Sequence, residues 1–454
     1  MSSSQLPIAI IGAGPVGLAA AARAAERNLP FVVLEAGDGV GSALREWGHV
    51  RVFSPWSFNI DDAAHALLKA KGWQAPIPTG LPTGREIAQH YLEPLAAHPA
   101  IAPNIILNAR VTRVARAEND KMNDANRAES PFVLRWRDSD GEEHETQARA
   151  VIDATGAWTQ PNPIGVNGLP VLGEAAAREF IDYGIPNVRE NRERFAGKRI
   201  LVVGGGHSAI NVALDLLALQ KEAPDTKVFW ALRRNRIEKL LGGGINDQLP
   251  ERGALGLAAM EAIKANRLTM LAPFAVSRIS TDGGTVKVQA KLANEDTSLD
   301  VDRIVVATGL RPDLDMLREL RVAIDPSVEA PPTLAPLIDP NLHSCGSVPP
   351  HGVVELTHPE PNFYIVGSKV YGRAPTFLMA TGYEQVRSVI AELAGDHEAA
   401  RRVELVLPET GVCSTSPVVG AKAAACCGPS DSKEDLAVST PVIAEEKACC
   451  GATA

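Results

Sequence analysis

The amino-acid sequence predicts an α/β fold of two related domains, with the second inserted in the first. Three observations support this: one series of elements occurs twice, a further strand and helix follow the second copy, and periodicity ends near residue 404. Each copy holds an apolar strand, a glycine-rich loop that opens a helix, a second strand, three short β-runs and an Ala-Thr-Gly turn. A repeated series of this length indicates a duplicated parallel-sheet unit.

The first copy begins close to the N-terminus. An apolar strand runs into loop 12–17 and an Ala-rich helix that ends near residue 28, and the last β-run ends in Ala154-Thr155-Gly156. Short runs of Val, Ile and Phe are typical of strands. The strands of this copy are expected at residues 7–11, 31–34, 108–114, 132–137 and 148–153.

The second copy has a loop at 204–209, a helix to about residue 220 and a final Ala307-Thr308-Gly309 turn. After it, segment 362–394 holds one more strand, 363–367, and a helix-like stretch from about 375 to 393. Such a strand and helix most economically return to complete the first domain. The strands of the second copy are expected at residues 199–203, 227–232, 274–279, 285–290 and 301–306.

The domain boundaries follow from this order. From about residue 404 the chain is rich in Ala, Pro, Ser, Thr and acidic residues, a composition that predicts a flexible, disordered tail. We therefore expect a first domain in two parts, 1–160 and 339–403, a second domain at 161–338, and a tail at 404–454.

Composition narrows the class of partner. The 454 residues are 45% hydrophobic and 22% charged, as in ordinary globular proteins, and the net charge of −9 gives no basic footprint for nucleic acid or anionic lipid. Glycines break the apolar N-terminal stretch, and no apolar run approaches the roughly 18 residues of a membrane helix. We expect a cytoplasmic protein that acts on small molecules, with a homodimer left open.

The first glycine-rich loop predicts a dinucleotide site. A pyrophosphate needs backbone N–H groups at a helix N-terminus and glycines that let the backbone approach it. Gly12, Gly14 and Gly17 have that spacing between a strand and a helix, and Glu35 ends the next strand 23 residues after Gly12, where a ribose-binding carboxylate is expected. The alternative is a structural turn with a surface glutamate.

The second loop predicts a second dinucleotide, and the residues after it favour NADPH over NADH. Gly204, Gly206 and Ala209 fit the same fingerprint, in which the third position is Gly or Ala. Arg233 and Arg234, with Arg236 close by, end the following strand, where a cation pairs with a 2′-phosphate. A solvated basic turn is the alternative. His207 is either a phosphate contact or only the residue that begins the helix.

These features resemble the flavin-containing monooxygenase and thioredoxin reductase group over roughly residues 5–395. The resemblance implies two Rossmann-like domains, of which the first binds FAD and the second NADPH, with both Ala-Thr-Gly turns beside the cofactors. It implies the FAD-binding residues Gly12, Ala13, Gly14, Pro15, Val16, Gly17, Glu35, Ser42, Val111, Thr155, Gly156 and Gly367. The corresponding NADPH-binding residues are Gly204, Gly206, His207, Ser208, Ala209, Arg233, Arg234, Thr308 and Gly309.

A narrower resemblance concerns stretches 51–56, 152–158 and 371–385, which are similar to flavoprotein monooxygenases encoded in bacterial arsenic-resistance operons. The chain departs from the wider group at two points. Neither domain holds the Cys-x-x-Cys pair of the thioredoxin reductases, and Leu201 stands where the flavin monooxygenase pattern has His, six residues after Phe195. Arg51, Trp56 and Tyr371 are candidates for the substrate pocket, although aromatic residues in such segments are as often core.

The six cysteines are distributed unevenly, because only Cys345 precedes residue 405. Soft thiolates on a mobile segment suit thiophilic metals or metalloids such as trivalent arsenic, and adjacent cysteines are similar to the C-terminal pairs of mercuric reductases. A thiol redox relay and the absence of any function are the alternatives. The candidate metal ligands are Cys413, Cys426, Cys427, Cys449 and Cys450.

Together these observations predict an FAD-dependent, NADPH-oxidising oxidoreductase in which the protein supplies position and electrostatics and the flavin supplies the chemistry. The missing cysteine pair favours a monooxygenase-like reaction with O₂, linked to a metalloid substrate. One alternative is an NADPH-dependent metal or disulfide reductase that uses the tail cysteines. Another is a metal-binding protein whose dinucleotide folds are not catalytic. The catalytic residues themselves are not identified by any motif.

Overall fold

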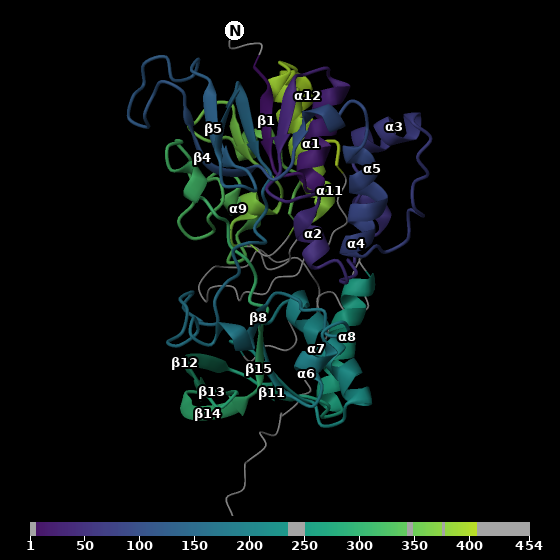
Figure 1. Cartoon of the computed structure of the whole chain (residues 1–454), viewed down its shortest axis with the longest axis vertical. Coiled ribbons are helices and arrows are strands. Elements are labelled where there is room, and N and C mark those ends of the chain that lie inside the picture. The colour runs from purple at the N-terminus through teal and green to yellow at the C-terminus, as the bar shows by residue number, and fades with distance from the viewer. Residues whose placement is uncertain (1–5, 235–249, 343–347, 375–376, 406–454) are drawn as a thin grey trace, which may run out of the picture. The chain divides into compact units, whose positions relative to one another are not determined.

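The computed structural model describes residues 6–234, 250–342, 348–374 and 377–405, and the structural statements below concern these ranges (Figure 1). Arg236, Cys345 and the five tail cysteines lie outside the described residues. The described part of the chain is mixed α/β with two parallel sheets, so the predicted fold class is confirmed.

The first sheet is parallel and has the strand order β16-β7-β1-β2-β3. Its central strand, β1, is apolar and buried, with no residue more than 3% exposed. The edge strand β16 pairs with β7 and comes from a segment more than 200 residues later in the sequence. The five strands are β1 (Ile8–Ile11), β2 (Phe31–Leu34), β3 (Ile105–Ile106), β7 (Ala150–Asp153) and β16 (Phe363–Ile365).

Helix α1 (Pro15–Glu26) packs beside α11 (Met379–Leu393), and Figure 1 shows the two side by side. Ala19, Ala20 and Ala21 of α1 have no exposed surface, since small side chains let this helix approach the sheet and α11 together. The other helical segments of this domain are α2 (Ser42–Glu46), η2 (Trp56–Phe58), α3 (Asp62–Ala70), α4 (Gly84–Ile87), η3 (Ala88–Leu92), α5 (Glu93–Ala96), η4 (Ala102–Asn104), α10 (Val353–Leu356), η9 (Gly367–Tyr371) and α12 (His397–Arg401).

A three-stranded antiparallel sheet, β4 (Arg110–Arg116), β5 (Phe132–Arg137) and β6 (Glu143–Ala148), belongs to the first domain. The second domain repeats both sheets. Its parallel sheet has the order β11-β10-β9-β15-β8, with β8 (Ile181–Tyr183), β9 (Arg199–Val203), β10 (Lys227–Ala231), β11 (Thr269–Leu271) and β15 (Arg303–Val306). Its antiparallel sheet comprises β12 (Phe274–Asp282), β13 (Thr285–Leu292) and β14 (Glu295–Val301).

The helices of the second domain follow the predicted order. Helix α7 (His207–Glu222) opens from the second glycine loop and packs against α8 (Pro250–Lys264). The remaining helical segments of this domain are η5 (Arg178–Phe180) and α6 (Arg192–Phe195). Later in the chain, η8 (Asp315–Leu317) and α9 (Ala335–Ile338) pack into the apolar core of the first domain, which includes Leu317 and Ile338.

The last β-run of each copy differs from the sequence expectation. Instead of single strands at 148–153 and 301–306, each run holds the end of one strand and a second strand in the other sheet. One residue separates them, Arg149 in the first copy and Asp302 in the second, and each donates its N–H to the residue that precedes or begins the central strand, at Pro7 and Arg199. The polar alternation of β6 and β14 hid these strands from an analysis based on apolar runs.

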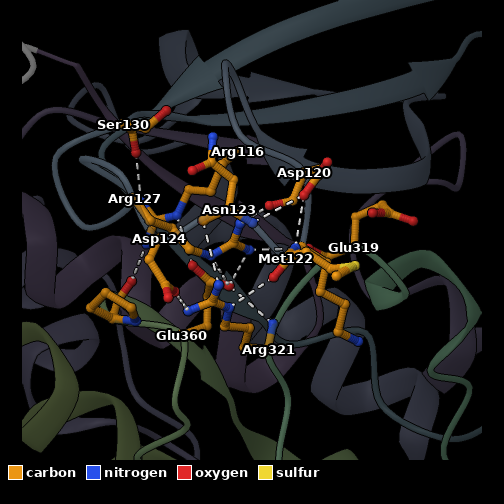
Figure 2. Close-up of polar contacts among 12 residues, drawn as sticks. Arg116, Asp120, Met122, Asn123, Asp124, Arg127, Ser130, Glu319, Arg321 and Glu360 are labelled. Atoms are coloured by element: carbon orange, nitrogen blue, oxygen red, sulfur yellow. Dashed lines mark hydrogen bonds and ion pairs between the residues drawn. The ribbon is translucent and has the colours of Figure 1, made fainter.

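A buried ion cluster fastens the strand that returns to the first domain (Figure 2). Glu360, three residues before β16, accepts from Arg116 Nε at 2.8 Å and from Arg127 Nη2 at 2.6 Å, and also from the backbone N–H of Arg321. The Glu360 side chain has no exposed surface. Although burial raises its pKa, the three donors outweigh burial and lower it. The cluster therefore joins the loop between β4 and β5 to the segment that enters β16.

We expect Glu360→Gln to lower the free energy of unfolding by about 3–5 kcal/mol, because two buried guanidinium groups lose their counter-charge. Urea unfolding of the full chain measures this. Since the folded-state pKa of Glu360 is lowered, its stabilisation is present above pH 4.5 and declines as the pH falls below that value. Glu143→Gln is the matched control, because the Arg137–Glu143 pair at 2.8 Å is solvent-exposed. Equal effects of the two substitutions would contradict the role assigned to burial.

Candidate functional site

The first glycine loop joins β1 to α1, and each of its three glycines meets a different requirement. Gly12 has φ +99°, and a Cβ there would lie 2.9 Å from the Ala154 carbonyl oxygen. A Cβ on Gly17 would overlap the Gly12 carbonyl oxygen. Gly14, the N-cap of α1, differs, because a Cβ there would meet no heavy atom of the described residues within 4 Å. The side of the loop at Gly14 is open to a ligand, whereas Gly12 and Gly17 permit close packing.

The second loop has the same arrangement of packed and open glycines, with Ala at the third position. Gly204 has φ +142°, and a Cβ there would overlap the Ala307 carbonyl oxygen. Gly206, the N-cap of α7, again has open space around the position of a Cβ within the described part of the chain. Ala209 takes the place of the third glycine and is fully buried, so the second loop accommodates a methyl group at a position where the first loop has none.

Glu35 follows β2 and is 7% exposed, so it is not a surface glutamate. Its Oε2 accepts from the Ala13 N–H at 2.6 Å, and its Oε1 accepts from the Gly37 N–H at 2.8 Å and from the Ser42 hydroxyl at 2.6 Å. A carboxylate offers about four lone-pair sites. Three protein donors therefore hold the group against the glycine loop and leave one site for a further donor.

Residues at the ends of β7 and β16 lie around the same loop. Thr155 donates through its N–H and its hydroxyl to Asp153 Oδ1, and Lys369 Nζ donates to Asp153 Oδ2 at 2.7 Å and to Thr155 Oγ1 at 3.0 Å. Gly156 and Gly367 have φ of +69° and +73°. Asp153 and Lys369 are buried and were missed by sequence reasoning, although a single charge inside each of two apolar runs was a signal.

Val111 lies near the start of β4, opposite Trp136, and is half-buried. The N–H of Ala109 donates to the Glu35 carbonyl at 2.7 Å, so the chain that leads into β4 is fastened to the end of β2. The structure thus brings Val111 to the strand end that carries Glu35.

In the second domain, Thr308 and Gly309 follow β15 and contact the segment that enters the domain. The Thr308 hydroxyl donates to the Asn162 carbonyl at 2.8 Å, and the Asn162 N–H donates to the Gly309 carbonyl. Arg233 and Arg234 follow β10 and are exposed. Although its surface is exposed, neighbouring protein atoms partly desolvate the Arg233 guanidinium and this, followed by the charge of Arg234, lowers the pKa of Arg233, so two like charges lie close together where the strand ends. His207 and Ser208 are the first two residues of α7.

The candidate substrate residues differ in exposure. Trp56 is 6% and Tyr371 2% exposed, and both belong to the main apolar core. The Tyr371 ring packs 5.6 Å from His351 and 5.5 Å from Phe377. Arg51 is exposed, and its guanidinium donates to the Leu81 carbonyl. Burial favours the core alternative for the two aromatic residues, and substrate contact by all three stays a prediction.

The predicted metal ligands Cys413, Cys426, Cys427, Cys449 and Cys450 lie outside the described residues. Within the described ranges, Asp138, Glu142 and His144 form one group of metal-ligand type on the exposed β5–β6 hairpin, where His144 Nε2 already lies 2.7 Å from Asp138 Oδ2. None of the helices in these ranges combines the length and the apolar character that crossing a membrane requires.

Over residues 9–339 the sequence matches the family described as pyridine nucleotide-disulphide oxidoreductase. The chain belongs to this family. Members depend on FAD and NADP(H), and the protein is accordingly an oxidoreductase that uses both cofactors, as the two loops predicted. The resemblance to the wider group of flavin monooxygenases and thioredoxin reductases is confirmed at the same level.

Three known proteins show what the chain is similar to. A probable indole-3-pyruvate monooxygenase of Arabidopsis thaliana is 31% identical over 211 residues, which span 46% of this chain and 43% of the relative, less than half of its length. A ferredoxin–NADP reductase of Symbiobacterium thermophilum is 24% identical over 70% of this chain and 77% of the relative. The bacillithiol disulfide reductase of Bacillus cereus shares the fold, with a TM-score of 0.62, 18% identity, and coverage of 86% of this chain and 99% of that one.

The two kinds of glycine should respond differently to a methyl group. We expect Gly17→Ala to destabilise the protein by about 1–3 kcal/mol or more, because the added Cβ overlaps the Gly12 carbonyl. Gly14→Ala should change stability by less than about 1 kcal/mol, since the N-cap of α1 has extended backbone angles that Ala adopts. Chemical unfolding without added flavin tests both, and a similar loss in the two variants would be inconsistent with an open Gly14.

Proposed function

We propose that the first glycine loop holds the pyrophosphate of FAD, the second holds that of NADPH, and the protein performs a monooxygenase-like reaction with O₂. The observation that carries this proposal is the open N-cap glycine of each loop, Gly14 and Gly206. Each stands at the N-terminus of a helix of 12 or 16 residues, whose free N–H groups and dipole favour an anion. The donor set therefore fits a phosphate group in both domains.

In this proposal, residues 1–160 and 339–403 form the FAD-binding domain, 161–338 form the NADPH-binding domain, and 404–454 form a tail. The remaining lone pair of Glu35 accepts from a ribose hydroxyl of FAD, while its other contacts hold the loop in shape. Arg233 and Arg234 pair with the 2′-phosphate of NADPH, which relieves the repulsion between them. When bound between these residues, the flavin would supply the redox chemistry that links NADPH oxidation to the electron acceptor.

The acceptor is argued from the distribution of thiols. A single cysteine, Cys345, precedes residue 405, so neither domain holds a cysteine pair that could exchange with a disulfide. This favours O₂ over a disulfide as the acceptor. The similarity to a plant monooxygenase over 46% of the chain supports the same choice. The five tail cysteines support the further proposal of a metalloid-linked substrate, because thiolates bind trivalent arsenic.

Two experiments on binding test the proposal. Wild-type protein should be yellow and bleached by NADPH; a protein that stays colourless after incubation with FAD would refute it. Gly14→Ala should raise the dissociation constant for FAD at least about tenfold, because the added methyl group occupies the open space and moves the pyrophosphate away from a backbone N–H, and losing one hydrogen bond to a charged group costs about 1.5–3 kcal/mol. Gly206→Ala is the matched control: it should keep the flavin and raise the KM for NADPH instead.

The acceptor is tested by removing the tail. A chain that ends at residue 405 should oxidise NADPH with O₂ at a rate within about twofold of the full chain, because the flavin-side chemistry needs no thiol. In the full chain, trivalent arsenic should lower the peroxide formed per NADPH. Loss of turnover on truncation would favour the reductase that uses tail cysteines. Peroxide yield that is indifferent to arsenic would remove the metalloid substrate from the proposal.

A further inference from the structure

A buried hydrogen-bonded chain holds the turn that follows β16. The backbone N–H of Gly367 donates to Oε1 of Gln385 at 2.7 Å, and Nε2 of that glutamine lies 2.9 Å from Nε2 of His351. Nδ1 of His351 lies 3.1 Å from the Pro349 carbonyl. Gln385 has no exposed surface and His351 has 1%. The chain thus runs from loop 348–352 through helix α11 to the Gly367 turn.

The direction of every hydrogen bond in this chain follows from one fixed donor. The Gly367 N–H can only donate, so the oxygen of Gln385 must face it and the amide NH₂ must face His351. Nε2 of His351 must then be the acceptor, without a proton. The ring proton stands on Nδ1, where it is donated to the Pro349 carbonyl. The arrangement is complete only with a neutral imidazole in this tautomer.

The turn at Gly367 lies against the helix that follows the first glycine loop. A Cβ on Gly367 would lie 3.4 Å from Val16 Cγ2, in the first turn of α1, and the positive φ of Gly367 leaves little freedom for another side chain. Gly382, at the start of α11, also approaches Val16. The Gly367 N–H bond to Gln385 therefore sets how the β16 turn lies against the N-terminus of α1.

We propose that Gln385 and His351 are positioning residues for FAD, which hold the Gly367 turn against the α1 N-terminus only while His351 is neutral, so that protonation of His351 weakens FAD binding. This inference rests on the proposed FAD site at the first glycine loop. Neither side chain is assigned a contact with the flavin. Protonation at Nε2 would set two donors against each other, and rotation of the Gln385 amide would merely move that conflict to the Gly367 N–H.

The surroundings of His351 favour the neutral ring. The titratable and charged groups around it are Glu355 on α10, Glu384 on α11 with its partner Arg387, and Tyr371 on η9. Burial lowers the pKa of His351 below 6.5, and this outweighs the bond to Pro349 and the two glutamates, which raise it. A histidine whose folded-state pKa is lowered stabilises the fold above pH 6.5, and this is lost as the pH falls.

The same linkage applies to the cofactor. If FAD favours the turn that needs neutral His351, then FAD lowers the proton affinity of His351, and a proton weakens FAD by the same factor. If the pKa of His351 is one unit lower with FAD bound than without it, FAD binds the protein with neutral His351 about ten times more tightly than the protein with protonated His351. Because pH 5 is not far below the lowered pKa of His351, we expect the dissociation constant for FAD to rise several-fold, by less than this factor, between pH 8 and pH 5.

The first test uses wild-type protein freed of flavin and titrated with FAD at pH 8 and pH 5, with circular dichroism as the check that it stays folded. Calorimetry at pH 6 in two buffers of different ionisation enthalpy counts the protons released on binding, which we expect to be a measurable fraction of one. The same affinity at both pH values, with no proton released, would overturn the inference. A protein that binds no FAD at pH 8 would instead refute the proposed function.

Two variants separate His351 from other acid effects. His351→Gln keeps an acceptor facing Gln385 but cannot be protonated, so the affinity ratio between pH 8 and pH 5 should fall below about twofold. Gln385→Glu places a carboxylate oxygen opposite Nε2 and favours the protonated ring, so FAD affinity should no longer decline in acid.

His358→Gln is the matched control. His358 is also a buried histidine, 4% exposed, but burial lowers its pKa to about 4, so it stays neutral throughout this pH range. Its Nδ1 lies against the Ala323 carbonyl rather than in the chain that reaches Gly367. This variant should keep the several-fold acid effect of the wild-type protein. An acid effect that persists unchanged in His351→Gln and Gln385→Glu would contradict the positioning role, and the wild-type proton count decides the matter if either variant fails to fold.

Discussion

The arrangement of the first domain depends on how closely α1 approaches the end of β1. A helix can present its free N–H groups to a phosphate only if its first turn lies directly beyond the strand. That approach requires Gly17, where any Cβ would overlap the Gly12 carbonyl. The Ala-rich face of α1 extends the same constraint along the helix, because larger side chains would separate it from the sheet and from α11. The second domain relaxes the constraint by one methyl group at Ala209.

Buried charges then fix the segments that surround this loop. Glu35 fastens the loop itself through Ala13, and the Asp153–Lys369 pair joins the ends of β7 and β16. Glu360 joins the entry to β16 to the antiparallel sheet through Arg116. Each carboxylate has several donors, which is the condition under which burying a charge is tolerated. The segment that returns from far along the sequence is therefore held by ion pairs as well as by strand pairing.

The strand–loop–helix unit of each domain could be predicted from the sequence because its interactions are local. The strand, loop and helix of each copy, and the order of glycines within them, depend on residues that are neighbours in the chain. Strand 199–203 was predicted at its observed bounds for that reason. The split of the last β-run at Arg149 and Asp302 was not predicted, because the strand before each split is mostly polar and only its pairing with a neighbouring strand reveals it.

By itself, the sequence determined the α/β class, the duplication, the two glycine loops and the family's cofactors, since each follows from short motifs and their spacing. Only the tertiary structure decided which glycines are open and which are packed, and how deeply Trp56 and Tyr371 are buried. It alone joined His351, Gln385 and Gly367, which stand in three separate segments. Contacts of this kind depend on how distant segments pack, and no spacing within a single segment encodes them.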